Sequence, residues 1–105
     1  MKQYTTPDQT ARLIELGFEK PKSVTGISWQ EDEKDNPIIN ANTIEYTRNY
    51  SIGELIEIID GKVTLEIDKL GARWIVSMLI FDFTGAELVD CLFDACVKLK
   101  EEGVI

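Results

Sequence analysis

Residues 62–83 read KVTLEIDKLGARWIVSMLIFDF and decide the fold class of this 105-residue chain. Apolar and polar side chains alternate over 62–68, the pattern of a strand with one buried and one solvated face. Lys69-Leu70-Gly71 has the length of a hairpin turn. Residues 72–83 follow as one strand that is apolar on both faces. The stretch therefore predicts an antiparallel pair whose second strand is central in a sheet or meets another subunit.

A helix is predicted directly after this strand pair, ending near Glu102. Thr84 has the side chain of an N-cap and Glu87 stands at N3, which together make a capping box. Gly103 lies past the end, where glycine takes the left-handed conformation at low cost. The apolar side of the helix is wider than one core stripe needs: it consists of Leu88, Leu92, Ala95, Cys96 and Leu99, broadened by Val89, Phe93 and Val97.

Two further helices are predicted upstream by the same capping chemistry. Residues 50–60 begin at Ser51, with Glu54 at N3. The first helix begins at Thr6, carries proline at its first position, and stops at Gly17. The starts of the second and third helices look alike, and shared helix-start physics explains this better than an internal duplication.

The chain as a whole is predicted to be one α+β domain spanning residues 1–105. Alternating apolar residues over 24–30 and 43–49 predict a hairpin with a long connection. The acidic stretch 31–35 begins that connection and lacks the spaced carboxylates of a calcium loop. We expect an antiparallel sheet of about four strands with three helices packed mainly on one face, in the order α-β-β-α-β-β-α.

The charge distribution excludes some classes of partner. The formal net charge is −8; residues 1–52 contribute −2 and residues 53–105 contribute −6. Phosphate backbones and anionic lipid surfaces repel such a chain, so neither nucleic acid nor membrane is an expected partner. A basic protein would be attracted, although solubility alone also explains a moderate net charge. The longest apolar runs fall well short of the roughly 20 residues of a membrane span.

The chain also lacks the residues of the common catalytic sites. It contains no histidine, which excludes a Cys–His nucleophile, and it has no glycine-rich phosphate loop. Cys91 and Cys96 lie five apart in one predicted helix, too far to form a disulfide, and indicate buried side chains in a reducing, cytoplasmic compartment. Neither a cofactor nor a metal site is predicted. Trp29, Tyr46 and Tyr50 could stack on a base or a peptide, but a small core is the expected place for them.

Three stretches carry a resemblance to a known group of proteins: Tyr50–Glu57, the strand around Trp74, and the C-terminal segment from Glu87 to Ile105. Together they resemble a family of small uncharacterised α+β proteins of gut anaerobic bacteria, often associated with prophages or mobile elements. The resemblance covers roughly the C-terminal half of the chain. It implies a small cytoplasmic α+β protein of mobile-element origin and carries over no catalytic residue.

These features predict a non-catalytic interaction or accessory protein that associates with itself as a homodimer or with a protein partner. One alternative is an acidic decoy or inhibitor that occupies a basic surface of a host protein, and the acidic loop 31–35 would take part in it. A small enzyme is the remaining alternative. The predicted interface combines the second face of the strand 72–83 with the broad side of the last helix: Ile75, Leu79, Phe81, Val89 and Phe93.

Overall fold

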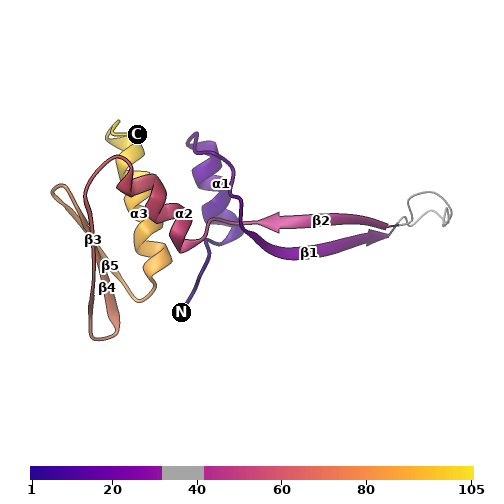
Figure 1. The fold of residues 1–105 in the computed structure, drawn as a ribbon, viewed down its shortest axis with the longest axis horizontal. Helices are drawn as coiled ribbons and strands as arrows, with labels where there is room; N and C mark the ends of the chain where they lie inside the picture. The colour runs from indigo at the N-terminus through magenta and orange to yellow at the C-terminus, as the bar shows by residue number, and fades with distance from the viewer. Residues whose placement is uncertain (32–41) are drawn as a thin grey trace.

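The computed structural model describes residues 1–31 and 42–105, which form three helices and five strands (Figure 1). The radius of gyration is 17.5 Å, against about 13 Å for a compact chain of this length, because two strands project from the rest. We call these strands, β1 and β2, the ribbon, and the remaining elements the body. The elements are α1 (Pro7–Glu15), β1 (Val24–Glu31), β2 (Asn42–Arg48), α2 (Ile52–Asp60), β3 (Leu65–Leu70), β4 (Arg73–Met78), β5 (Phe81–Gly85) and α3 (Leu88–Glu101).

The α+β class and the order of helices and strand groups are confirmed, but the expected single sheet of about four strands is not. The strands form two antiparallel sheets, one of β1 and β2 and the other in the order β3-β4-β5. In Figure 1 the helices α2 and α3 lie between the two sheets. Because the helices occupy that space, the first hairpin cannot extend the second sheet.

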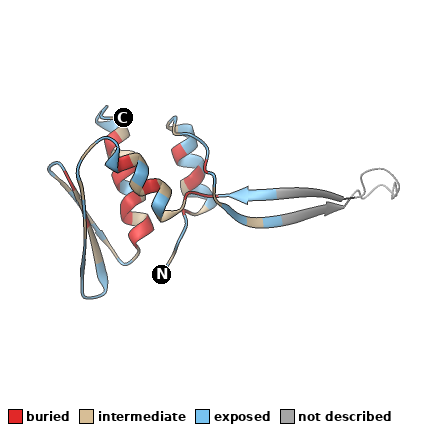
Figure 2. Cartoon of the chain, viewed as in Figure 1, coloured by how far each residue is buried: buried red, intermediate tan, exposed pale blue. Residues whose placement is uncertain are grey.

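Two of the three helices cover one face of the three-stranded sheet. Helix α2 contacts β3, and α3 contacts β4 and β5, whereas α1 packs on α3 rather than on the sheet. Figure 2 shows the buried residues gathered on the helices, whereas the ribbon carries no buried residue in the part where burial is described. The core therefore lies between α3 and its neighbours, and its fully enclosed side chains include Leu13, Leu55, Ile59, Val76, Val89, Leu92 and Leu99.

The predicted long strand 72–83 is two strands joined by a turn. Leu79 has φ of +51°, a left-handed conformation that is unfavourable for leucine, and the chain reverses there. The register pairs Val76 with Phe83 and Met78 with Phe81, so both phenylalanines return to the helix-covered face. This reversal removes the second apolar face that the sequence predicted, because one continuous strand would have placed Phe81 on the outer side.

The start of α3 also differs from the prediction. Thr84 lies in β5, paired with Ile75, and Glu87 is the N-cap residue, without a side-chain capping bond. Gly85, at the end of β5, lies close to α3: a Cβ there would stand 3.2 Å from the Cys91 sulfur, which favours glycine at this position. The Glu87 carboxylate instead accepts a hydrogen bond from the Lys2 backbone N–H at 2.7 Å. The predicted capping box at this helix is therefore wrong.

The other two capping boxes are confirmed. Thr6 and Gln9 exchange hydrogen bonds at the start of α1, and Ser51 and Glu54 do so at the start of α2. Gly17, with φ of +99°, follows the end of α1 as predicted. Local capping chemistry therefore suffices to predict helix starts that no strand competes for.

Candidate functional site

The ribbon is a two-stranded sheet without cover from any described element. Strand β1 pairs with β2, and neither contacts another helix or strand among residues 1–31 and 42–105. An isolated two-stranded ribbon is marginally stable in water, since its strands have little apolar surface to bury. The ribbon is therefore the first candidate for an interaction surface.

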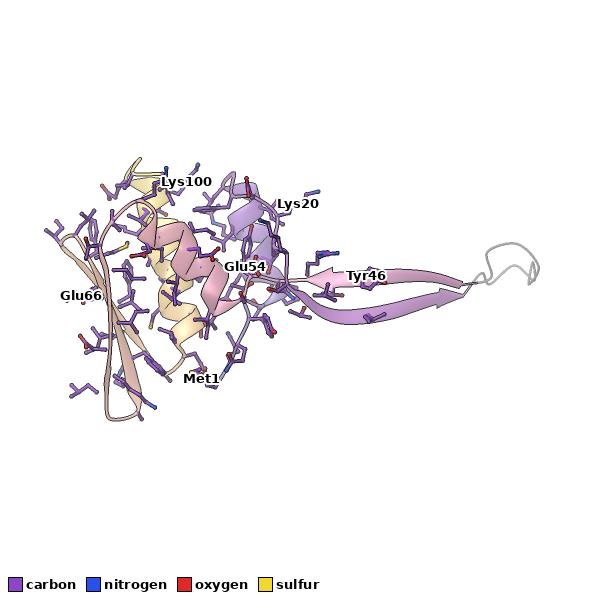
Figure 3. The ribbon with its side chains drawn as sticks, in the orientation of Figure 1. Met1, Lys20, Tyr46, Glu54, Glu66 and Lys100 are labelled. Carbon is purple, nitrogen blue, oxygen red and sulfur yellow. The ribbon has the colours of Figure 1, made fainter. Side chains whose placement is uncertain are left out.

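Apolar side chains stand exposed on the ribbon. Ile27 and Tyr46 are directly opposite each other in the register and are 60% and 55% exposed. Val24, near the base, is exposed as well. Figure 3 shows Tyr46 on the ribbon, well away from the body. Two positions further along, the register pairs Trp29 with Ile44.

The two outer edges of the ribbon differ. The Thr47 carbonyl oxygen accepts a hydrogen bond from the Thr25 hydroxyl at 3.3 Å, so the backbone polar groups of Thr47 face β1. Because successive residues of a strand point these groups to opposite sides, the N–H and C=O of Tyr46 face outward. On β1 the register shifts between Val24 and Gly26, which leaves Thr25 bulged.

A buried polar network holds the base of the ribbon to the body. The hydroxyls of Thr5 and Thr10 lie 2.7 Å apart, and the Thr10 hydroxyl also donates to the Asn49 side-chain oxygen. The Asn49 amide donates to the Thr25 hydroxyl at 2.8 Å, and the Tyr50 backbone N–H donates to the Thr5 hydroxyl at 3.0 Å. Thr5, Thr10 and Asn49 are all buried, so this network fixes the ribbon relative to α1.

Glu54 forms a second junction between ribbon and body. Its carboxylate accepts hydrogen bonds from the backbone N–H groups of Lys22 and Ser23, from the Ser23 hydroxyl, and from the Ser51 backbone N–H. Burial by itself would raise the pKa of Glu54, but these hydrogen bonds outweigh burial and hold its pKa below the ordinary value. One carboxylate thus caps α2 and holds the chain that leads into β1. Figure 3 shows Glu54 beside the base of the ribbon.

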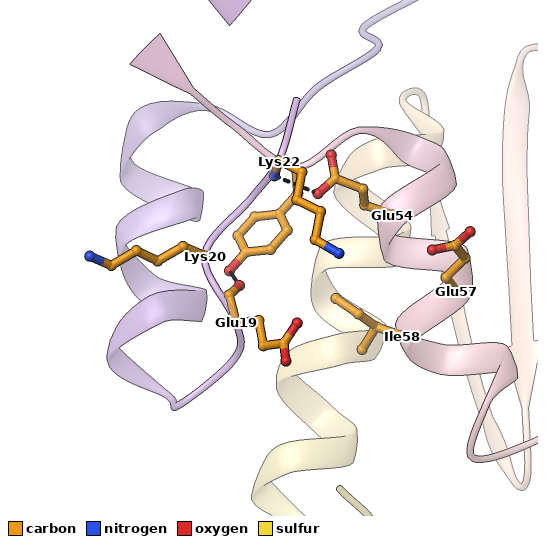
Figure 4. A pocket seen from close by; sticks show the side chains of 7 residues that line it. Glu19, Lys20, Lys22, Glu54, Glu57 and Ile58 are labelled. Carbon is orange, nitrogen blue, oxygen red and sulfur yellow. Dashed lines mark hydrogen bonds between the residues drawn. The ribbon is translucent and has the colours of Figure 1, made fainter. Parts of the chain in front are cut away.

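A hollow of about 210 Å³ lies beside this junction and contains several charged side chains (Figure 4). The Tyr50 hydroxyl donates to the Glu19 carbonyl oxygen. Burial, followed by the nearby Glu54 charge, raises the pKa of Tyr50 to about 12. Since the pKa of Glu54 is lowered, neither group titrates near pH 7, where general acid–base catalysis needs its pKa values. The remaining lining residues are Lys20, Lys22, Glu57 and Ile58.

A larger hollow of about 340 Å³ adjoins the first and has Glu19, Glu57 and Ile58 in common with it. Phe18 and Ile105 add apolar surface, and the Lys100 ammonium lies 5.6 Å from the centre of the Phe18 ring. Lysines and glutamates both line this hollow, so it favours no one charge of ligand. A third hollow, of about 220 Å³, is lined by Thr64, Glu66, Ser77, Met78 and Leu79 at one end of the three-stranded sheet.

The five residues of the predicted interface are dispersed over the body. Val89 is fully buried in α3, and Phe93 is half-buried against the same core. Phe81 faces the helices, with the Lys98 ammonium 4.9 Å from its ring centre. Ile75 is half-buried on the opposite face of the sheet, and Leu79 is exposed at the turn. The structure therefore does not bring the five together on one face.

The two cysteines are free and buried, as predicted. Burial raises the pKa of the Cys96 thiol to about 12, which makes it a poor nucleophile. Among the described residues no three Cys, Asp or Glu side chains are grouped to hold a metal ion. Of the acidic stretch 31–35, residues 32–35 lie outside the described residues. No helix in the described ranges is long and apolar enough to cross a bilayer.

Comparisons with known proteins find no match for this chain among family models, curated proteins or solved structures. The resemblance to prophage-associated proteins of gut anaerobes therefore stays a prediction. The ribbon and its junction with the body are the described features that bear most directly on function.

The sequence contains the alternating pattern of the two ribbon strands, but that pattern predicted that their apolar side chains would be buried. The alternation predicted that Ile27 and Tyr46 each lie on one face of a strand, and the expected place for that face was a core. Tyr50 does lie in the core, whereas Tyr46 is exposed. Alternation identifies the apolar face of a strand but not what covers it.

Proposed function

We propose that the protein is a non-catalytic interaction protein that associates with itself or with a protein partner through the ribbon. The observation that supports this most strongly is the exposed pair Ile27 and Tyr46 on a ribbon that no described element covers. A partner that covers this face would remove apolar surface from water, which is the main driving force of association.

The junction supports the same proposal. A buried hydrogen-bonded network stabilises only when each of its groups finds a partner, and the Thr5–Thr10–Asn49 network meets that condition. It joins the ribbon to the body at a fixed angle, with Glu54 as a second attachment. A ribbon held in this way presents its face to a partner at little entropic cost, which favours affinity.

The test compares two double variants of equal charge change. Ile27→Lys with Tyr46→Lys places two ammonium groups on the ribbon, and Leu70→Lys with Leu79→Lys places two on exposed leucines at the turns of the body. We expect the ribbon variant to lose self-association in sedimentation velocity, and to lose any protein that the tagged wild type captures. The body variant should behave as the wild type does. If only the body variant loses self-association or the captured protein, the interaction site lies at the turns of the three-stranded sheet, one of which carries Leu79.

An acidic decoy is the second candidate, and one feature of the body favours it. Glu66, Asp68 and Asp82 are exposed on the face of the three-stranded sheet that the helices leave uncovered. Such a face would attract a basic protein surface. Capture of a basic protein that is released by moderate salt and lost in Glu66→Gln with Asp82→Asn would favour this candidate over the ribbon.

A further inference from the structure

We infer that the partner of the ribbon is the ribbon of a second copy of this chain, joined edge to edge through antiparallel β2 strands. This inference rests on the proposed function and adds its partner and its geometry. The product is a four-stranded sheet in which two β2 strands lie at the centre and a twofold axis passes between them. Twofold symmetry makes the contact self-complementary, because each copy contributes the same edge.

Of the two outer edges of the ribbon, the β2 edge is better suited to pair with another strand. The register gives each residue from Asn42 to Arg48 a partner on β1 in unbroken order, and the N–H and C=O of Tyr46 face outward. The β1 edge is interrupted near its base by the bulge at Thr25 and by Gly26. Bulges are a common means of preventing edge-to-edge pairing, so β1 is protected where β2 is not.

Pairing at this edge also provides what the isolated ribbon lacks. Three or more strands with a shared apolar face are needed for a stable sheet in water. Two ribbons joined at β2 bring two copies of the Ile27–Tyr46 pair onto one continuous surface. Each ribbon thereby gains hydrogen bonds along one edge and apolar neighbours across it.

The charge pattern favours a second copy over contact through the body. The described strands of the ribbon hold two acids, Glu31 and Glu45, and one base, Arg48, a net charge of −1, whereas the body, residues 1–23 and 49–105, has a net charge of −5. Contact through the bodies would bring two strongly acidic surfaces together, whereas contact through the ribbons does not.

The same pattern favours the antiparallel orientation. Lys22 and Arg48 lie at the base of the ribbon, where the Arg48 guanidinium donates to the Lys22 carbonyl oxygen, and Glu31 stands in the last pair at the far end. Antiparallel pairing places the acidic end of one copy beside the basic end of the other.

The first experiment replaces an outward N–H on each edge. Tyr46→Pro removes a donor from the β2 edge without removing a β1–β2 hydrogen bond, and proline is tolerated at such positions. Ile27→Pro is the matched control, because its register with Tyr46 turns its own N–H outward on the β1 edge. Tyr46→Ala removes the ring and keeps the N–H. We expect Tyr46→Pro to raise the dimer Kd at least about tenfold in sedimentation equilibrium, since each copy loses one donor.

We expect Ile27→Pro to change that Kd by less than about threefold, because its edge is not used. A dimer that survives Tyr46→Pro and is lost in Ile27→Pro would overturn pairing through β2. Tyr46→Ala separates the N–H from the ring: if it weakens the dimer as much as Tyr46→Pro does, the contact uses the face of the ribbon rather than its edge.

A second measurement does not depend on how the ribbon tolerates proline. Tyr46→Cys, close to the middle of β2, should form an intermolecular disulfide under mild oxidation, whereas Ile27→Cys, one strand further from the axis in each copy, should not. The natural cysteines are buried and stay unreactive. Equal cross-linking of both variants, or a wild type that stays monomeric at about 100 μM, would overturn the inference. In the latter case the proposed function stands only if a captured partner is lost with Ile27→Lys and Tyr46→Lys.

Discussion

The two sheets of this protein contain similar strands, but helices cover the apolar face of only one of them. The outer strands of the three-stranded sheet, β3 and β5, and the strands of the ribbon alternate apolar with polar residues. In the body, α2 and α3 cover the apolar face, and Val76 and Met78 are buried there. On the ribbon, Ile27 and Tyr46 occupy equivalent positions and remain exposed. The difference shows that the strand pattern defines an apolar face. The surrounding elements decide whether that face becomes part of the core or stays exposed as a candidate interface.

The largest expected effect is the difference in stability between two isoleucine-to-alanine variants, one in the body and one on the ribbon. Ile59→Ala, in the body, should lower the free energy of unfolding by about 2–5 kcal/mol, because Ile59 is fully enclosed and its loss leaves a cavity. Ile27→Ala, on the ribbon, should change it by less than about 0.5 kcal/mol. Urea denaturation at a concentration where the protein is monomeric measures both. Equal losses would mean that the ribbon face is covered within one chain.

The next effect concerns the junction that separates the two regions. Glu54→Ala removes the capping box of α2 and the acceptor for the backbone of Ser23, and should cost about 1–2 kcal/mol. Glu57→Ala, an exposed carboxylate on the same helix, is the control and should stay within about 0.5 kcal/mol. Amide exchange should rise at Ser23 in the first variant only. An unchanged exchange rate there would contradict the role of Glu54 in holding the ribbon.

A smaller effect should appear when the pH is lowered. The folded-state pKa of Glu54 lies below its ordinary value of 4.5, so its contribution is complete above pH 4.5 and is lost as the pH falls through the folded-state pKa. Below pH 4.5 we expect amide exchange at Lys22 and Ser23 to rise before exchange in the core at Leu92 does. Glu54→Gln should abolish that pH dependence. Simultaneous loss of protection at all three positions would show that ribbon and body unfold as one unit.

The smallest expected effect is a stabilisation at the turn between β4 and β5. Leu79→Gly should raise the free energy of unfolding by up to about 1 kcal/mol, because glycine adopts the left-handed conformation that leucine resists. Ile80→Gly, at the neighbouring exposed position without positive φ, should give no gain. Thermal denaturation distinguishes the two. A loss in Leu79→Gly would mean that the leucine side chain contributes more than its backbone conformation costs.

Two similar stretches show how far local sequence can be trusted. Tyr50-Ser51 and Phe83-Thr84 both precede a glutamate at the N3 spacing, and both predict a capping box. Ser51 forms one, but Thr84 is paired with Ile75 in β5, so the N-cap of the helix is Glu87, three residues later than predicted. The difference is that the second stretch is part of the continuous β4–β5 ladder, whereas the first forms only a single bridge, between Ser51 and Tyr4.

The sequence by itself determined the α+β class, the existence of all three helices, the first hairpin and the buried, unpaired cysteines, because capping, alternation and helix spacing act over a few residues. The tertiary structure decided where the strand 72–83 turns, that the strands separate into two sheets, and that Ile27 and Tyr46 rather than Phe81 and Val89 remain exposed. The physical reason is that burial depends on which elements lie opposite a face, and those elements are brought there by contacts between residues far apart in the chain.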